Sequence, residues 1–110
     1  MSLTSELEEL KGFKDFLILD EQGKVLLRQA KGGGFSQGVL SGYLASVYSI
    51  ADRTTMPFTS NITEISFDGE GGSVLVMKGK DKYFMLLLEG TPSMGIARLK
   101  LRTLVDNYEQ

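Results

Sequence analysis

The side chains that could carry out chemistry in this chain are of few types, because its 110 residues include no cysteine and no histidine. Disulfides, thiolate nucleophiles, iron–sulfur ligation, soft zinc sites and Ser-His-Asp triads are therefore excluded. Carboxylates, lysine, arginine, tyrosine, serine and threonine remain. We expect no catalytic residue, no metal and no cofactor, and we interpret the chain as a non-enzyme.

Two stretches could still suggest a site. Glu6, Glu8 and Glu9 could pair as carboxylates, but a solvated first helical turn favoured by the helix dipole explains them better. The segment Gly32–Gly38 lies between a predicted strand and a predicted helix, where phosphate loops occur. It matches neither the dinucleotide fingerprint nor the Gly-Lys-Ser/Thr ending, which favours a connector.

The arginines have two possible uses. Arg28 and Arg53 could act in trans on a nucleotide phosphate, although nothing in the sequence positions either guanidinium. A basic group near the C-terminus consists of Arg98, Lys100 and Arg102. The spacing favours a solvated face on which Arg102 pairs with Asp106.

A run without any charged residue covers residues 32–51. From Phe35 onward the apolar residues have helical spacing, and the side expected to face a sheet consists of Val39, Leu40, Tyr43, Leu44, Val47, Ile50 and Ala51. A stripe of small residues consists of Gly38, Gly42, Ala45 and Ser49. The remaining strip consists of Gln37, Ser41, Tyr48 and Asp52. Because this helix lacks the usual charged outer face, we expect something to cover it.

The rest of the chain predicts an α+β fold in one domain, residues 1–110. A short helix should reach Leu10 and end at Gly12, and a last helix should run from Pro92 to about Tyr108. The predicted strands are Phe13–Asp20, Lys24–Gln29, Asn61–Asp68, Ser73–Lys78 and Tyr83–Leu88. The first, fourth and fifth are apolar on both faces and should be central; the other two should be edges.

A hairpin joined to a three-stranded meander, with those two edges, gives an antiparallel sheet of order 2-1-5-4-3. The neutral helix should cover one face and the terminal helices the other, in three α/β/α layers. The net charge of −2 does not favour nucleic acid or an anionic membrane. The acidic N-terminus is not a secretory signal, and the glycines and serines of the neutral run disfavour a membrane span, so we expect a cytoplasmic protein.

Two stretches resemble the roadblock/dynein light chain domain, a profilin-like fold. Residues 16–25, Phe-Leu-Ile-Leu-Asp-Glu-Gln-Gly-Lys-Val, are similar to the first hairpin of that family. Residues 93–102, Ser-Met-Gly-Ile-Ala-Arg-Leu-Lys-Leu-Arg, resemble the last helix of its prokaryotic branch, the MglB-like regulators of small GTPases. The resemblance covers nearly the whole chain and rests on patterns rather than on catalytic residues.

The resemblance implies a homodimer in which the central helix packs on its twofold mate and the third strand pairs with its counterpart. The interface would use the small-residue stripe together with Ile62, Glu64 and Ser66. The alternative for the stripe is a close approach of the helix to its own sheet, and we favour the dimer contact. Gln37, Ser41, Tyr48 and Asp52 would contact a small Ras-like GTPase. Two alternatives remain open, namely a ligand-sensing domain of the PAS type and a structural adaptor that needs no nucleotide.

Overall fold

The computed structural model describes residues 5–22, 24–29, 37–90 and 93–108, with the side chains of these residues except 37–45. The elements in chain order are α1 (Ser5–Glu8), β1 (Phe13–Asp20), β2 (Val25–Arg28), α2 (Gln37–Thr55), β3 (Glu64–Asp68), β4 (Gly72–Lys78), β5 (Lys82–Glu89) and α3 (Met94–Tyr108). The five strands form one antiparallel sheet of order β2-β1-β5-β4-β3. The predicted fold class and strand order are therefore confirmed.

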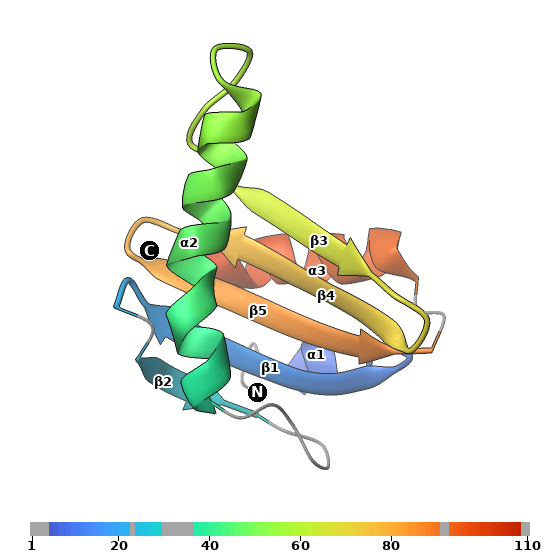
Figure 1. Cartoon of the computed structure of the whole chain (residues 1–110). Helices are drawn as coiled ribbons and strands as arrows, with labels where there is room; N and C mark the ends of the chain where they lie inside the picture. Colours follow the sequence, from blue (N-terminus) through green and yellow to red (C-terminus); the bar gives the residue numbers. More distant parts are fainter. Residues whose placement is uncertain (1–4, 23, 30–36, 91–92, 109–110) are drawn as a thin grey trace.

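The helices lie on the two faces of the sheet, as expected. α2 crosses one face, and α1 and α3 lie behind the other (Figure 1). β1, β4 and β5 are central because they bury side chains on both faces, each face with its own core cluster. Phe16, Ile18, Phe84 and Leu86 pack toward α1 and α3. Leu17, Leu19, Met85 and Leu87 pack on the α2 side.

Gly12 connects α1 to the sheet through a backbone conformation that suits glycine. Its φ is +84°, and a Cβ there would lie 2.3 Å from the carbonyl oxygen of Glu89. The carbonyl oxygen of Gly12 also accepts a hydrogen bond from the Glu89 N–H at 2.7 Å. The close approach of these two backbones explains why the chain needs glycine where the helix gives way to β1.

The element ends differ from the prediction in a few places. β3 begins at Glu64 rather than Asn61, because Asn61 has a φ of +54° and cannot be part of an extended strand. The last helix begins at Met94 rather than Pro92 and ends at Tyr108 as expected; Tyr108 is exposed, with its ring edge-on to Phe84 at 5.5 Å between centroids. Among the described residues, no helix combines the length and the hydropathy needed to cross a membrane.

The surface around helix α2

Tyr48 attaches α2 to the sheet. It is only 3% exposed, and it is the one buried residue among the described side chains of α2, residues 46–55. Its hydroxyl donates to the carbonyl oxygens of Val76 at 3.1 Å and Thr63 at 3.4 Å. The centroid of its ring lies 5.2 Å from the ring centroid of Tyr83. A single aromatic side chain with a satisfied hydroxyl therefore fixes how the second half of α2 is rotated.

This rotation overturns part of the sequence interpretation. Tyr48 was predicted to contact a partner, and that assignment is wrong because the side chain is buried under its own helix. Ile50 was predicted to face the sheet, but it is 56% exposed. The two residues lie about 200° apart around a helix, so burying one turns the other to solvent. Within residues 46–55, helical spacing therefore misplaced Tyr48 and Ile50, whereas Val47 and Ala51, also predicted to face the sheet, are partly buried.

Burial also perturbs the acid–base behaviour of this tyrosine. Burial raises the pKa of Tyr48 well above its ordinary value, and the nearby Tyr83 and Glu64 raise it further, while Arg102 acts in the opposite sense. Burial likewise raises the pKa of Tyr83. Both hydroxyls therefore stay protonated in the folded protein at pH values where they begin to ionise in the unfolded chain.

We expect the free energy of unfolding to fall as the pH rises above about 10, the ordinary pKa of tyrosine. The folded pKa is raised, so the stabilisation is fully present below the unfolded pKa and is lost above it. The slope contributed by Tyr48 should approach ~1.4 kcal/mol per pH unit. Urea unfolding from neutral pH into the alkaline range would measure it. Tyr48→Phe is the control, and equal slopes for the two proteins would contradict the assignment.

The other predicted partner-contact residues lie on the same helix. Asp52 is half-buried, and its Oδ1 accepts a hydrogen bond from the N–H of Ile62 at 2.8 Å. This bond ties α2 to the segment that enters β3. Gln37 and Ser41 lie in the first half of α2, and their side chains are outside the described part of the structure. The predicted strip is thus not assembled as an exposed surface where it is described.

The predicted dimer residues lie in two places. Gly38, Gly42 and Ala45 belong to the first half of α2, whose side-chain surroundings are not described, whereas Ser49 is exposed. Ile62 packs partly against the core cluster on the α2 side of the sheet. Ser66 is exposed on β3, the strand with β4 as its one neighbour in the sheet order. The expectation that β3 is an edge is confirmed; its pairing with a second copy remains a prediction.

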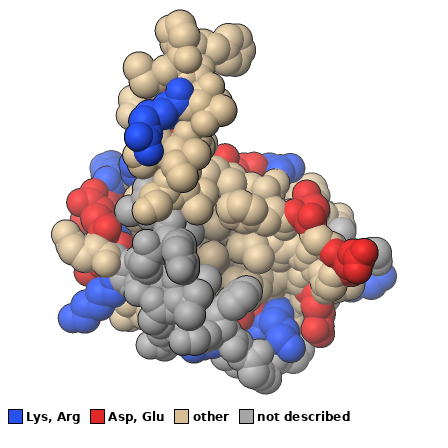
Figure 2. Space-filling view, in the orientation of Figure 1, with Lys and Arg blue, Asp and Glu red and all other residues tan. Residues whose placement is uncertain are grey.

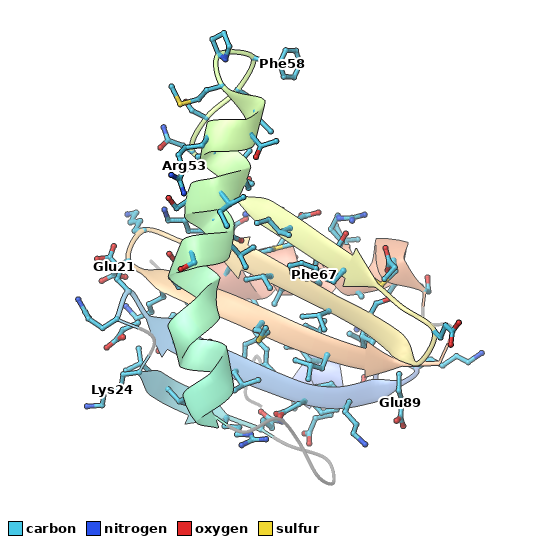
Figure 3. The ribbon with its side chains drawn as sticks, viewed as in Figure 1. Glu21, Lys24, Arg53, Phe58, Phe67 and Glu89 are labelled. Carbon is cyan, nitrogen blue, oxygen red and sulfur yellow. The ribbon has the colours of Figure 1, made fainter. Side chains whose placement is uncertain are left out.

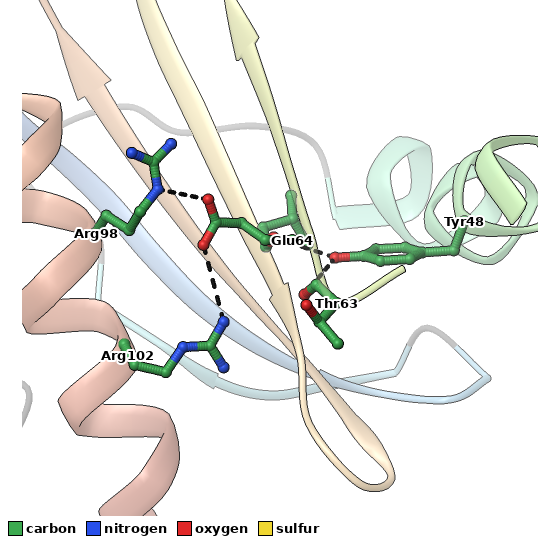
Figure 4. A network of polar contacts seen from close by, with 6 residues as sticks. Tyr48, Thr63, Glu64, Arg98 and Arg102 are labelled. Carbon is green, nitrogen blue, oxygen red and sulfur yellow. Dashed lines mark hydrogen bonds and ion pairs between the residues drawn. The ribbon is translucent and has the colours of Figure 1, made fainter. Parts of the chain in front are cut away.

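Glu64 points away from α2, toward the opposite side of the sheet. Its carboxylate accepts a short hydrogen bond from Arg98 Nε and lies 3.8 Å from an Arg102 nitrogen (Figure 4). Arg102 was expected to pair with Asp106, and the structure pairs it with Glu64 instead. The preceding residue, Thr63, accepts the Tyr48 hydroxyl (Figure 4). Two consecutive residues thus connect the start of β3 to α2 on one face and to α3 on the other.

The sequence interpretation missed a buried ion pair between β1 and β2. Asp15 is fully buried, and its Oδ2 lies 3.0 and 3.1 Å from two guanidinium nitrogens of Arg28. Its Oδ1 accepts the N–H of Phe16 at 2.8 Å. The sequence did contain a signal for this ion pair, because Asp15 and Arg28 are opposite charges that interrupt the two apolar strands of one hairpin. Arg28 is therefore held by Asp15 and is not free to act in trans, whereas Arg53 is exposed and forms no ion pair with a described carboxylate.

Large apolar side chains are exposed where α2 leaves the sheet. α2 extends beyond β3, and Phe58 lies near the tip of the projection (Figures 1 and 3). Phe58 is 92% exposed, and Ile50 and Met56 are also mainly exposed. Phe67 is exposed on β3. It shares a sheet face with Ile65, two residues earlier, which packs into the cluster on the α2 side. We call Ile50, Met56, Phe58 and Phe67 the α2–β3 apolar patch. On the face seen in Figure 2, the projecting end shows a single blue group among uncharged side chains, at the position of Arg53 in Figure 3.

The strand order, with one long helix on one face of the sheet and two helices on the other, defines the class of fold as the profilin-like α/β/α sandwich. Profilin Ib of Acanthamoeba castellanii superposes with a TM-score of 0.68 at 14% identity, over 97% of this chain and 96% of that one. Neither family sequence models nor curated protein sequences match the chain.

Within this class the chain has the roadblock type of fold. A structure described as MglB with a tetrameric arrangement superposes with a TM-score of 0.84 at 17% identity, over 96% of this chain and 81% of that one. A Roadblock/LC7 domain from Streptomyces avermitilis gives 0.80 at 11% identity, over 96% and 90%. The predicted resemblance is confirmed at the level of fold.

Proposed function

We propose that the protein is a homodimeric, non-enzymatic module that binds and regulates a small Ras-like GTPase in the cytoplasm. The α2–β3 apolar patch carries the first half of this proposal. An aromatic side chain as exposed as Phe58, at the tip of the projection, and an edge strand such as β3 are each a liability in a monomer and characteristic of an interface (Figures 1 and 3). The projecting end of α2 leads through residues 56–63 into β3, so one twofold axis near β3 could bring both into contact with a second copy (Figure 1).

The partner class rests on the likeness to MglB and on the shape of α2. In a dimer built along β3, the two α2 helices would lie on the same side of a continuous sheet and would form one rigid platform. Among the described residues such a platform offers no evident catalytic group, because Arg28 is held by Asp15 and no contact in the structure places Arg53 near a phosphate. It would act by selecting one conformation of the GTPase.

The single long α2 favours this proposal over a PAS-like sensor, in which several short helices would occupy its place. A structural adaptor would also be a dimer, and it would differ only in binding its partner independently of nucleotide.

Dimerisation is tested by replacing two exposed side chains of the α2–β3 apolar patch. We expect the wild-type chain, of 12.1 kDa, to have twice that mass by light scattering. The double variant Ile50→Glu/Phe58→Asp should be monomeric, since it places charges on two apolar side chains that the proposed interface would bury. Leu99→Asp, which changes an exposed leucine on the opposite face of the sheet, should stay dimeric. A monomeric wild type, or a double variant that stays dimeric, would contradict the interface. Gly42→Glu separately tests the small-residue stripe.

The GTPase assignment is tested by pull-down with the small GTPases of the same genome, each loaded with GDP or with a non-hydrolysable GTP analogue. Preferential binding of one nucleotide state is the expected result. Binding that ignores the nucleotide would support the adaptor, and a small molecule that co-purifies with the chain would support the sensor. The Tyr48→Phe variant, which keeps the ring and the outer surface of α2, should bind like the wild type.

A further inference from the structure

A second surface lies on the sheet face opposite α2, where the segment that follows α1 meets β5 and α3. It is a groove of about 240 Å³ whose walls include Leu10, Leu88 and Ala97. Leu88 and Ala97 belong to the buried core, so the groove reaches down to the packed interior. A dimer formed through α2 and β3 would leave this face open in both copies.

The groove is continued by an apolar ridge on α3. Ile96 lines it and is 53% exposed, and Leu99, three residues further along the helix, is 69% exposed. Residues three and four apart on a helix are neighbours on its surface, so Ile96, Leu99 and Lys100 form one continuous strip. Two large aliphatic side chains in solvent beside an apolar groove are typical of a binding surface.

The rim of the groove is basic. Lys11 and Lys100 line it together with a single carboxylate, Glu9. Neither lysine forms an ion pair with a carboxylate in the described part of the chain, whereas Lys14, Lys82, Arg28, Arg98 and Arg102 all do. The groove therefore offers two free ammonium groups at the border of an apolar surface. Its volume is below the range usual for drug-sized ligands and suits one or two side chains.

We propose that this groove docks a short segment of a partner protein in which apolar anchor residues are flanked by aspartate or glutamate. The anchors would fill the groove and cover Ile96 and Leu99, and the carboxylates would pair with Lys11 and Lys100. The dimer would then carry two such sites on the face away from its α2 platform. The protein could thereby link two acidic, amphipathic segments to whatever the platform binds.

The test begins with selection from a phage library of random peptides of about twelve residues on the full-length chain. We expect the enriched peptides to combine an apolar anchor with acidic neighbours. The best synthetic peptide is then titrated by fluorescence polarisation. Lys100→Glu and Leu99→Ser should each weaken its binding by about tenfold or more, and Lys100→Arg should retain it.

Matched controls come from β2 and the turn before it. Lys24→Glu and Leu26→Ser change an exposed lysine and an exposed leucine far from the groove and should leave the affinity within about twofold. Thermal unfolding confirms that each variant is folded. The proposal is overturned if no acidic peptide is enriched, or if Lys100→Glu binds as well as the wild type. It is also overturned if the chain self-associates through this face, seen as a larger assembly that Leu99→Ser/Lys100→Glu abolishes.

Discussion

Arg28→Met is expected to lower the free energy of unfolding by about 3–5 kcal/mol, the largest effect we foresee for a residue outside the apolar core. The substitution keeps the aliphatic stem of the side chain and removes only the guanidinium. It leaves the carboxylate of Asp15, which is fully buried, with the N–H of Phe16 as its remaining partner among the described contacts. An uncompensated buried charge is costly because burial removes its hydration.

A second variant separates the charge from the loss of packing. Asp15→Asn/Arg28→Met removes the charge but keeps an oxygen that can accept the Phe16 N–H, so it should recover at least half of the loss. Lys14→Met on the same strand is the control, since its pair with Glu89 is exposed at 3.7 Å and should contribute about 1 kcal/mol at most. Urea unfolding measures all four proteins. A double variant as unstable as Arg28→Met would show that packing, not charge, makes Arg28 important.

Tyr48→Ala is expected to cost about 3–5 kcal/mol, because it removes a buried aromatic ring and leaves a cavity under α2. Since small domains have ~5–15 kcal/mol of stability in total, the loss would be a large share. Tyr48→Phe keeps the ring and leaves two carbonyl oxygens without the hydroxyl, so about 1–2 kcal/mol is expected.

The position of Tyr48 also predicts which part of the protein unfolds locally when this side chain is removed. No other side chain among residues 46–55 is buried, so its removal should release this second half of α2 before the sheet unfolds. Hydrogen exchange should then accelerate in α2 and leave β1, β4 and β5 protected. Arg53→Ala, on the exposed side of the same helix, should change stability by less than about 0.5 kcal/mol. Uniform acceleration across sheet and helix would contradict the role of Tyr48 as the anchor of α2.

The sequence determined the layout of the sheet. Runs such as Leu17–Leu19 and Leu86–Leu88 are apolar on both faces, which only a central strand covered by helices can accommodate. Tight turns between neighbouring strands then limited the order of the sheet, and the alternating β3 was recognisable as an edge. These features are local, because they depend on the period of the chain and on its turns.

Only the tertiary structure decided which residues the surface presents. The rotation of α2 depends on the hydrogen bonds that the hydroxyl of Tyr48 donates to the carbonyl oxygens of Val76 and Thr63, which lie far along the chain. Helical spacing alone ranks Ile50 as core and Tyr48 as surface, and the pairing with the sheet reverses both. The partners of Arg28 and Arg102 were likewise decided across strands and layers, where Asp15 and Glu64 lie. Helical spacing shows which residues share a side of the helix, but long-range contacts determine what covers each side.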